Sequence, residues 1–125
     1  MSEFATLSRA GYEAIVADDL DAFLKVADKK VEFISLVEGR SYRGHKGVRQ
    51  WWDEVLRSLG GLNLELDEVT DFDDHGYVKL VAKASKGEIE IPDAIWQAAR
   101  VKNGKITWWG SFASETEARD ALGID

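Results

Sequence analysis

The chain has two kinds of side chain that could support acid–base chemistry near neutral pH: its two histidines and several of its carboxylates. His45 lies in the stretch YRGHKGVRQWWDEVL, residues 42–56, between two glycines and shortly before a tryptophan pair. Histidine changes its charge near neutral pH and can act as a general acid or base. Because His45 follows Gly44 where a helical pattern begins, we interpret it as a residue of the first helical turn; an acid or base at a pocket mouth is the alternative.

Carboxylates on or near predicted strands are the other candidates for a base. One that faced a buried pocket would have a raised pKa and could accept a proton near neutral pH. Glu88 and Glu90 alternate with isoleucines, which is typical of side chains on a solvent-facing strand surface. Asp93 follows Pro92 at a strand irregularity, so its direction stays open. The candidates are Glu32, Glu38, Glu88, Glu90 and Asp93.

The sequence predicts neither a metal site nor a cofactor. The stretch DFDDHG, residues 71–76, resembles the opening of a calcium loop, but the glutamate that closes such a loop would fall on Ala82. A hairpin turn explains the same composition. His45 and His75 lie on separate turns and the chain has no cysteine, so no set of three metal ligands is expected.

Composition predicts one soluble domain that spans residues 1–125. The formal net charge is −7, and Lys29-Lys30 is the only adjacent basic pair. Such a chain repels phosphate backbones and anionic lipids, so we expect no nucleic acid and no membrane among its partners. The chain lacks both a run of about 18 apolar residues and the apolar stretch of a secretory signal, so a cytoplasmic location is expected.

Periodicity predicts an α+β fold in which helices precede a meander of antiparallel strands. Helical spacing of apolar residues covers residues 4–15, 18–28 and 48–59, and Asp18 is a candidate cap for the second helix. Ser114 and Glu117 form a capping box for a last helix that Gly123 ends. Strand patterns cover residues 30–37, 62–72, 77–85, 87–102 and 105–113.

The tryptophans predict both a core and an interface. Trp51 and Trp52 are about 100° apart on a helix, so one can fill the core while the other lies near a pocket or an interface; the second interpretation is that both only fill the core. The few helices cannot cover the outer face of the meander. One or more of Trp96, Trp108 and Trp109 on that face would form an exposed apolar patch, which predicts a homodimer.

Three motifs in order resemble the SnoaL-like and ketosteroid-isomerase-like branch of the nuclear transport factor 2-like superfamily. They are ADDLDAFLKVADKKVEF, YRGHKGVRQWW and RVKNGKITWWGSFASETEARDALGI. The resemblance implies a cone-shaped domain in which a strongly curved antiparallel sheet wraps around the N-terminal helices and encloses one pocket, commonly in a homodimer. It does not imply a reaction, because this fold serves isomerases, cyclases, dehydratases, hydrolases and proteins without catalysis.

An overlay on ketosteroid isomerase implies that its catalytic groups are altered in this chain. The general base falls on Ser35, the phenol donor on Gly11 beside Tyr12, and the carboxylic acid donor near Gln97. A serine without an activating partner is no base near neutral pH, so we assign no catalytic residue.

The expected site is therefore a largely apolar pocket with neutral polar contacts. Its candidate residues are Tyr12, Ser35, Trp52, Asp93, Gln97 and Trp109. Such a pocket suits a small apolar or neutral organic molecule. Two functions stay open: an isomerase, cyclase, dehydratase or hydrolase, and a non-catalytic dimeric binding or interaction module. An inward-facing Asp93, Glu32 or His45 would favour the enzyme.

Overall fold

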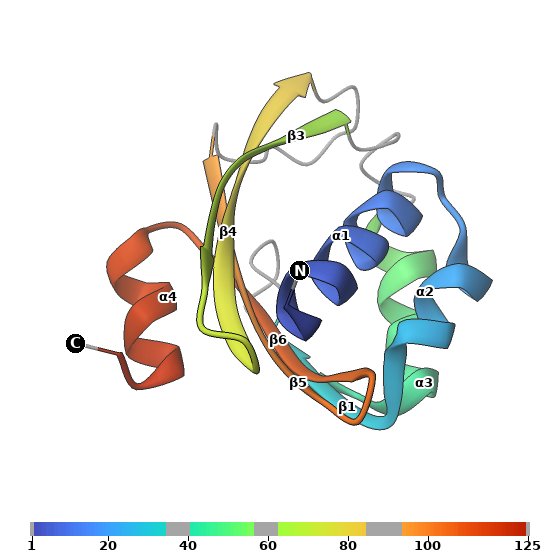
Figure 1. The fold of residues 1–125 in the computed structure, drawn as a ribbon. Helices are drawn as coiled ribbons and strands as arrows, with labels where there is room; N and C mark the ends of the chain where they lie inside the picture. Colours follow the sequence, from blue (N-terminus) through green and yellow to red (C-terminus); the bar gives the residue numbers. More distant parts are fainter. Residues whose placement is uncertain (1, 35–40, 57–62, 85–93, 125) are drawn as a thin grey trace.

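A strongly curved six-stranded sheet holds three helices against its concave face and one against its convex face (Figure 1). The computed structural model describes residues 2–34, 41–56, 63–84 and 94–124. The helices are α1 (Glu3–Val16), α2 (Leu20–Val26), α3 (Gly44–Trp51), which continues into a π-helical turn (Trp52–Leu56), and α4 (Glu115–Leu122). The α+β class predicted from periodicity is confirmed.

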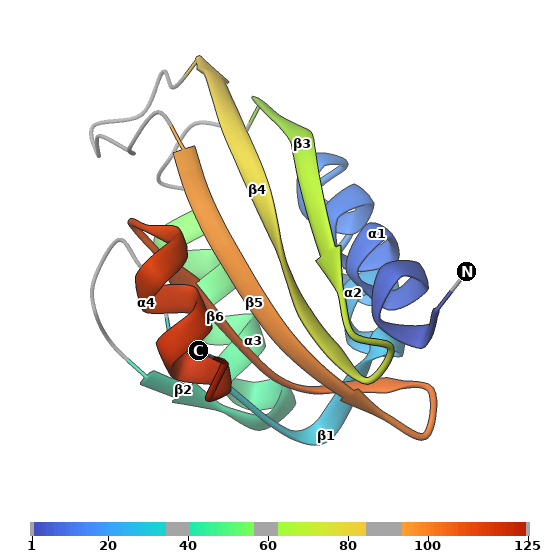
Figure 2. The same ribbon diagram turned by 60° about the vertical axis from the view of Figure 1, so that its left-hand side comes forward.

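The sheet has the strand order β2-β1-β6-β5-β4-β3 (Figure 2). β1 pairs in parallel with β6, and every other neighbouring pair is antiparallel. The strands are β1 (Ala27–Ile34), β2 (Ser41–Arg43), β3 (Asn63–Asp71), β4 (His75–Ala84), β5 (Ala94–Lys102) and β6 (Lys105–Phe112). The two predicted hairpins are confirmed, and residues 72–74 form the turn between β3 and β4. The short strand β2 was not predicted.

Capping residues fix where the helices begin. Ser114 accepts a hydrogen bond from the backbone N–H of Glu117, as predicted for α4. The prediction that Asp18 caps α2 was wrong, because Asp19 accepts the hydrogen bond from the N–H of Ala22. Asp18 instead adopts a left-handed φ of 54°, and its carboxylate accepts a 2.6 Å hydrogen bond from Nε1 of Trp52.

The core on the concave side is built around stacked aromatic rings. Trp109 lies parallel to Phe33 at 3.8 Å and edge-on to Phe23 at 5.0 Å between ring centroids. Trp51 is 9% exposed and Trp52 is fully buried, so both fill the core, which confirms the second of the two interpretations of this pair. α3 packs against β1 and β2 while α2 approaches it from another side, so both indoles meet core residues.

A smaller core lies on the convex face, where α4 crosses the sheet (Figure 2). Tyr77, on β4, is buried here; its hydroxyl donates to Glu115 at 2.7 Å and accepts from Arg119 at 2.8 Å. Trp96 and Trp108 are partly buried around this cluster. Trp109 faces the opposite core, so it does not belong to the outer patch that we expected.

No helix within residues 2–34, 41–56, 63–84 and 94–124 has both the length and the apolar character to cross a membrane.

Candidate functional site

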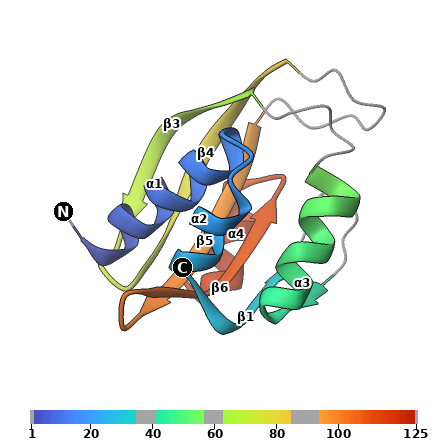
Figure 3. The same cartoon turned by 90° about the vertical axis from the view of Figure 1, so that its right-hand side faces the viewer.

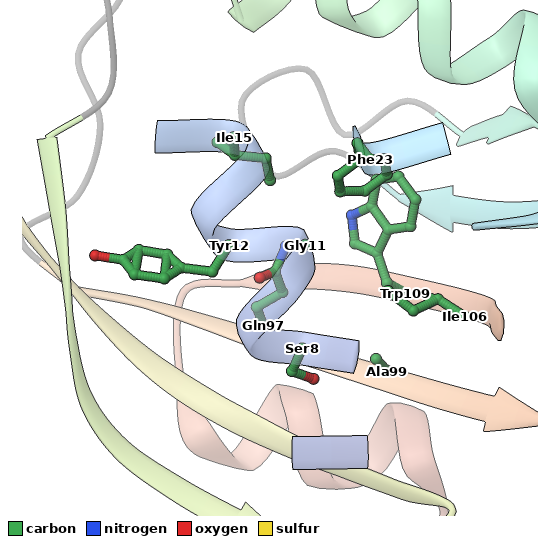
Figure 4. Close-up of a pocket in the computed structure, with 9 residues that line it drawn as sticks. All are labelled: Ser8, Gly11, Tyr12, Ile15, Phe23, Gln97, Ala99, Ile106 and Trp109. Atoms are coloured by element: carbon green, nitrogen blue, oxygen red, sulfur yellow. The ribbon is translucent and has the colours of Figure 1, made fainter. Parts of the chain in front are cut away.

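A small cavity lies between α1 and the concave face of the sheet (Figure 4). α1 forms one wall, β5 and β6 form the opposite wall, and Phe23 of α2 closes one side. The lining residues are Ser8, Gly11, Tyr12, Ile15, Phe23, Gln97, Ala99, Ile106 and Trp109. The volume is about 20 Å³, which is room for about one water molecule.

Gly11 gives the cavity its space on the helix side. It is buried in the middle of α1, where glycine destabilises a helix by about 1 kcal/mol relative to alanine. A methyl group at this position would lie 3.5 Å from Cε2 of Phe23 and 3.6 Å from Cδ1 of Ile106, at ordinary van der Waals distances. Packing alone would therefore accept alanine here, and the glycine leaves unfilled space beside the cavity.

The polar groups that line the cavity are neutral at physiological pH. Gln97 projects its amide from β5 toward α1 beside Gly11 (Figure 4). Burial raises the pKa of the Tyr12 hydroxyl, and the negative charges of Glu65 and Glu13 raise it further. Tyr12 therefore keeps its proton well above neutral pH and can serve as a hydrogen-bond donor. Ser8 adds one hydroxyl from the same helix face.

The predicted site residues fall into three groups. Tyr12, Gln97 and Trp109 line the cavity. Trp52 lies behind it, fully buried and edge-on to Phe23 at 5.5 Å between ring centroids. Ser35 and Asp93 lie outside the described residues.

Sequence reasoning missed several lining residues, including Ser8, Ile15 and Phe23. Ser8 precedes Gly11 by three residues, and Ile15 follows Gly11 by four. Residues at these spacings share one helical face, so helical periodicity could have located both. Ala99 lies two residues beyond Gln97 on the same face of β5, where the two-residue period of a strand would have placed it.

Of the candidate bases, Glu32 and His45 are described and both lie away from the cavity, whereas the others lie outside the described residues: Glu38, Glu88, Glu90 and Asp93. Glu32 is on an exposed position of β1 and pairs with Arg43 at 3.2 Å. His45 lies in the first turn of α3, as predicted, but it does not cap the helix; its Nε2 is 2.9 Å from the carbonyl oxygen of Ala27. Among the cavity-lining residues that the structure describes, none carries a carboxylate or an imidazole. These walls can hold an apolar molecule and hydrogen-bond it, but they do not supply a general base near neutral pH.

The family model of the SnoaL-like domain matches residues 8–109. This span includes every described element from the middle of α1 to Trp109. The chain belongs to the SnoaL-like domain family. A comparison with curated proteins gave no match.

Solved structures confirm the nuclear transport factor 2-like fold that the sequence motifs suggested. TerC, co-crystallised with polyporic acid, is 18% identical with a TM-score of 0.77, over 98% of this chain and 99% of TerC. A protein from Catenulispora acidiphila with a ketosteroid isomerase-like fold, in complex with trimethylamine, is 15% identical with a TM-score of 0.70, over 98% and 95% of the two chains. A nuclear transport factor 2-like protein of unknown function from Burkholderia pseudomallei is 18% identical with a TM-score of 0.70, over 96% of this chain and 97% of that protein.

Proposed function

We propose that this SnoaL-like protein binds a small apolar or neutral organic molecule between α1 and the sheet. The observation that carries the proposal is Gly11, which keeps space beside an apolar cavity at a cost in helix stability. Two proteins of this fold have been crystallised with polyporic acid and trimethylamine, which supports small-molecule binding. The neutral amide of Gln97 would orient a carbonyl or hydroxyl group of the ligand.

The ligand must widen the cavity, because a volume of about 20 Å³ holds about one water molecule. Tyr12 is the aromatic residue of the wall that lies outside the packed ring cluster, since its side chain is only partly buried while Trp109 and Phe23 are held in the aromatic core. We infer that the ligand displaces the Tyr12 ring and then contacts Gln97 and Trp109.

Binding without catalysis is the version of the proposal that the described walls favour, because they offer no general base. An isomerase, cyclase, dehydratase or hydrolase acting on an apolar substrate is the alternative. It requires a base from outside the described residues, and Asp93 is the candidate. Turnover of a bound compound that Asp93→Asn abolishes would establish the enzyme.

Replacing Gly11 with alanine should raise the melting temperature and weaken ligand binding about tenfold. Helix propensity gives the first effect, and loss of space beside the cavity gives the second. Binding is measured by quenching of tryptophan fluorescence with neutral cyclic ketones, from cyclohexanone to a ketosteroid. Mass spectrometry of material that remains bound through native purification supplies further candidates.

The matched control for this experiment is Thr6→Ala, at an exposed position of α1. It also raises helix propensity, but it leaves the cavity unchanged. Thr6→Ala should therefore stabilise the protein without weakening ketone binding. Equal affinities in Gly11→Ala and the unmodified protein would reject this cavity as the binding site.

We also propose that the protein is a homodimer in which the convex face of the sheet forms the interface. Partly buried aromatic side chains, Trp96, Trp108 and Phe112, surround the cluster beneath α4. Such a group at the surface is typical of an interface.

Light scattering at micromolar concentration should give twice the mass of one chain for the unmodified protein. Trp108→Glu should reduce the measured mass to that of one chain. Phe72→Glu, at an exposed aromatic on the β3–β4 turn, should leave the dimer intact. A monomer mass for the unmodified protein would contradict the dimer.

A further inference from the structure

A second hollow lies where α2 runs into β1. It has a volume of about 430 Å³. The first turn of α3, the beginning of β1 and the β5–β6 hairpin meet at this end of the molecule, the lower end in Figure 3. The lining residues, which we call the basic groove, are Leu24, Ala27, Asp28, Lys29, Lys30, His45 and Lys105.

Segments far apart in the sequence bring the cations of the basic groove together. Ala27 at the start of β1 pairs with Ile106 of β6, so Lys105 lies beside the α2–β1 junction. Its ammonium group donates a hydrogen bond to the carbonyl oxygen of Lys25, which holds the side chain at the groove. Lys29 and Lys30 follow directly along β1.

His45 and Asp28 are also held in place. Nε2 of His45 lies 2.9 Å from the carbonyl oxygen of Ala27; since a carbonyl only accepts, this nitrogen carries the hydrogen and the ring orientation is fixed. Asp28, the only acidic residue of the groove, accepts a 2.8 Å hydrogen bond from the backbone N–H of Lys30. Its carboxylate therefore already has a partner within the chain.

The charge of the basic groove is opposite to that of the whole chain. The residues that line the groove include three lysines and one aspartate, whereas the chain has a formal net charge of −7. A concave group of like charges attracts counter-ions more strongly than scattered surface charges do. The buried side chains of Leu24 and Ala27 form an apolar floor beside these cations. A ligand with an anionic head and a short apolar body would match both features.

We propose that the basic groove binds the phosphate or carboxylate group of a small organic anion, with its apolar part against Leu24 and Ala27. The ammonium groups of Lys30 and Lys105 contact the anionic head. This site is separate from the proposed cavity for a neutral molecule, and none of the residues that line it lines the cavity. Failure of either proposal therefore leaves the other standing.

Titration of the ¹⁵N-labelled protein with three aromatic probes tests the proposal by NMR. Phenyl phosphate and benzoate should change the chemical shifts of the backbone amides of residues 27–30, 44–46 and 105. The probe that binds with the higher affinity identifies the preferred head group. Benzyl alcohol, which has the ring without the charge, should leave these amides unchanged. Equal shifts with the neutral probe, or shifts confined to the cavity residues 8–15, would overturn the proposal.

The double variant Lys30→Gln/Lys105→Gln should weaken binding of the anionic probe about tenfold, because it removes two exposed charge contacts to the anionic head. Arg9→Gln, on the exposed face of α1 and outside the groove, removes one positive charge where the double variant removes two, and it should bind like the unmodified protein. Unchanged affinity in the double variant, or an equal loss in Arg9→Gln, would show that the groove is not the site.

Discussion

Replacing Trp109 with alanine should destabilise the protein by about 4 kcal/mol, the range expected for removal of a large buried aromatic. Trp109 is 3% exposed and contacts the rings of Phe33, Phe23 and Trp51, at 3.8, 5.0 and 5.9 Å between centroids. Its loss leaves these rings facing a void that the sheet backbone cannot collapse to fill. Urea denaturation followed by far-UV circular dichroism measures the change in the free energy of unfolding.

Two further variants make this prediction specific. Trp109→Phe keeps a ring that can stack on Phe33 and should lose less stability than the alanine variant. Phe72→Ala removes an aromatic that is 40% exposed, and surface substitutions typically change stability by about 0.5 kcal/mol or less. If Trp109→Ala proved no more costly than Phe72→Ala, the aromatic stack would not be the centre of the core.

The order of the elements was predictable because local patterns determine each one. Polarity alternates along β3 and β4, Asn103-Gly104 marks the last hairpin, and Ser114 caps α4 as its spacing to Glu117 predicts. The strand β2 was missed because a three-residue edge strand has too few positions to show a period. The parallel pairing of β1 with β6 could not follow from either strand alone, because their residues lie far apart in the chain.

The environment of Trp52 could not be predicted from its helix alone. A cap for α2 was available at both Asp18 and Asp19, and the choice depends on a tertiary contact. Asp18 takes a left-handed backbone conformation and accepts the indole hydrogen of Trp52, which satisfies a buried donor. This hydrogen bond holds Trp52 in the core, behind the cavity that it was expected to line.

The two candidate sites differ in how far the sequence could reveal them. Tyr12 and Trp109 were identified from the resemblance and from their aromatic character, and both line the cavity. The basic groove was missed because Lys105 is distant in sequence from Lys30, and each looked like an ordinary surface lysine. His45 stood out in its motif, but its place in the groove depends on where α3 meets the start of β1.

The cavity wall formed by α1 depends on how the helix start is fixed to two hairpin turns. The backbone N–H of Phe4 donates to the carbonyl oxygen of Asp73 at 3.0 Å, and the side chain of Glu3 accepts from the N–H of Gly104 at 2.7 Å. Phe4 is fully buried and its ring lies against Gly76 on β4. The position of Gly11 and Tyr12 over the sheet therefore depends on contacts about two turns earlier in the same helix.

Replacing Gly76 with alanine should destabilise the protein by about 3 kcal/mol, at the upper end of the usual cost of overpacking. The added methyl would lie 2.3 Å from the carbonyl oxygen of Thr70 and 2.7 Å from Cε2 of Phe4. The carbonyl belongs to the β3 backbone and cannot move without disturbing its pairing with β4, so the Phe4 ring and the start of α1 must shift as well. Urea denaturation gives the loss in stability.

Hydrogen exchange should then show faster exchange along α1 in Gly76→Ala, and ketone binding at the cavity should weaken with it. Gly123→Ala is the matched control, at the end of α4 and away from α1: no atom lies within 4 Å of its added methyl, but its φ of 74° is unfavourable for alanine. That conformational cost is about 1 kcal/mol, and it should not increase exchange in α1. Slow exchange of α1 in Gly76→Ala would mean that Phe4 does not hold the helix, because the clash would then have been relieved within the hairpin alone.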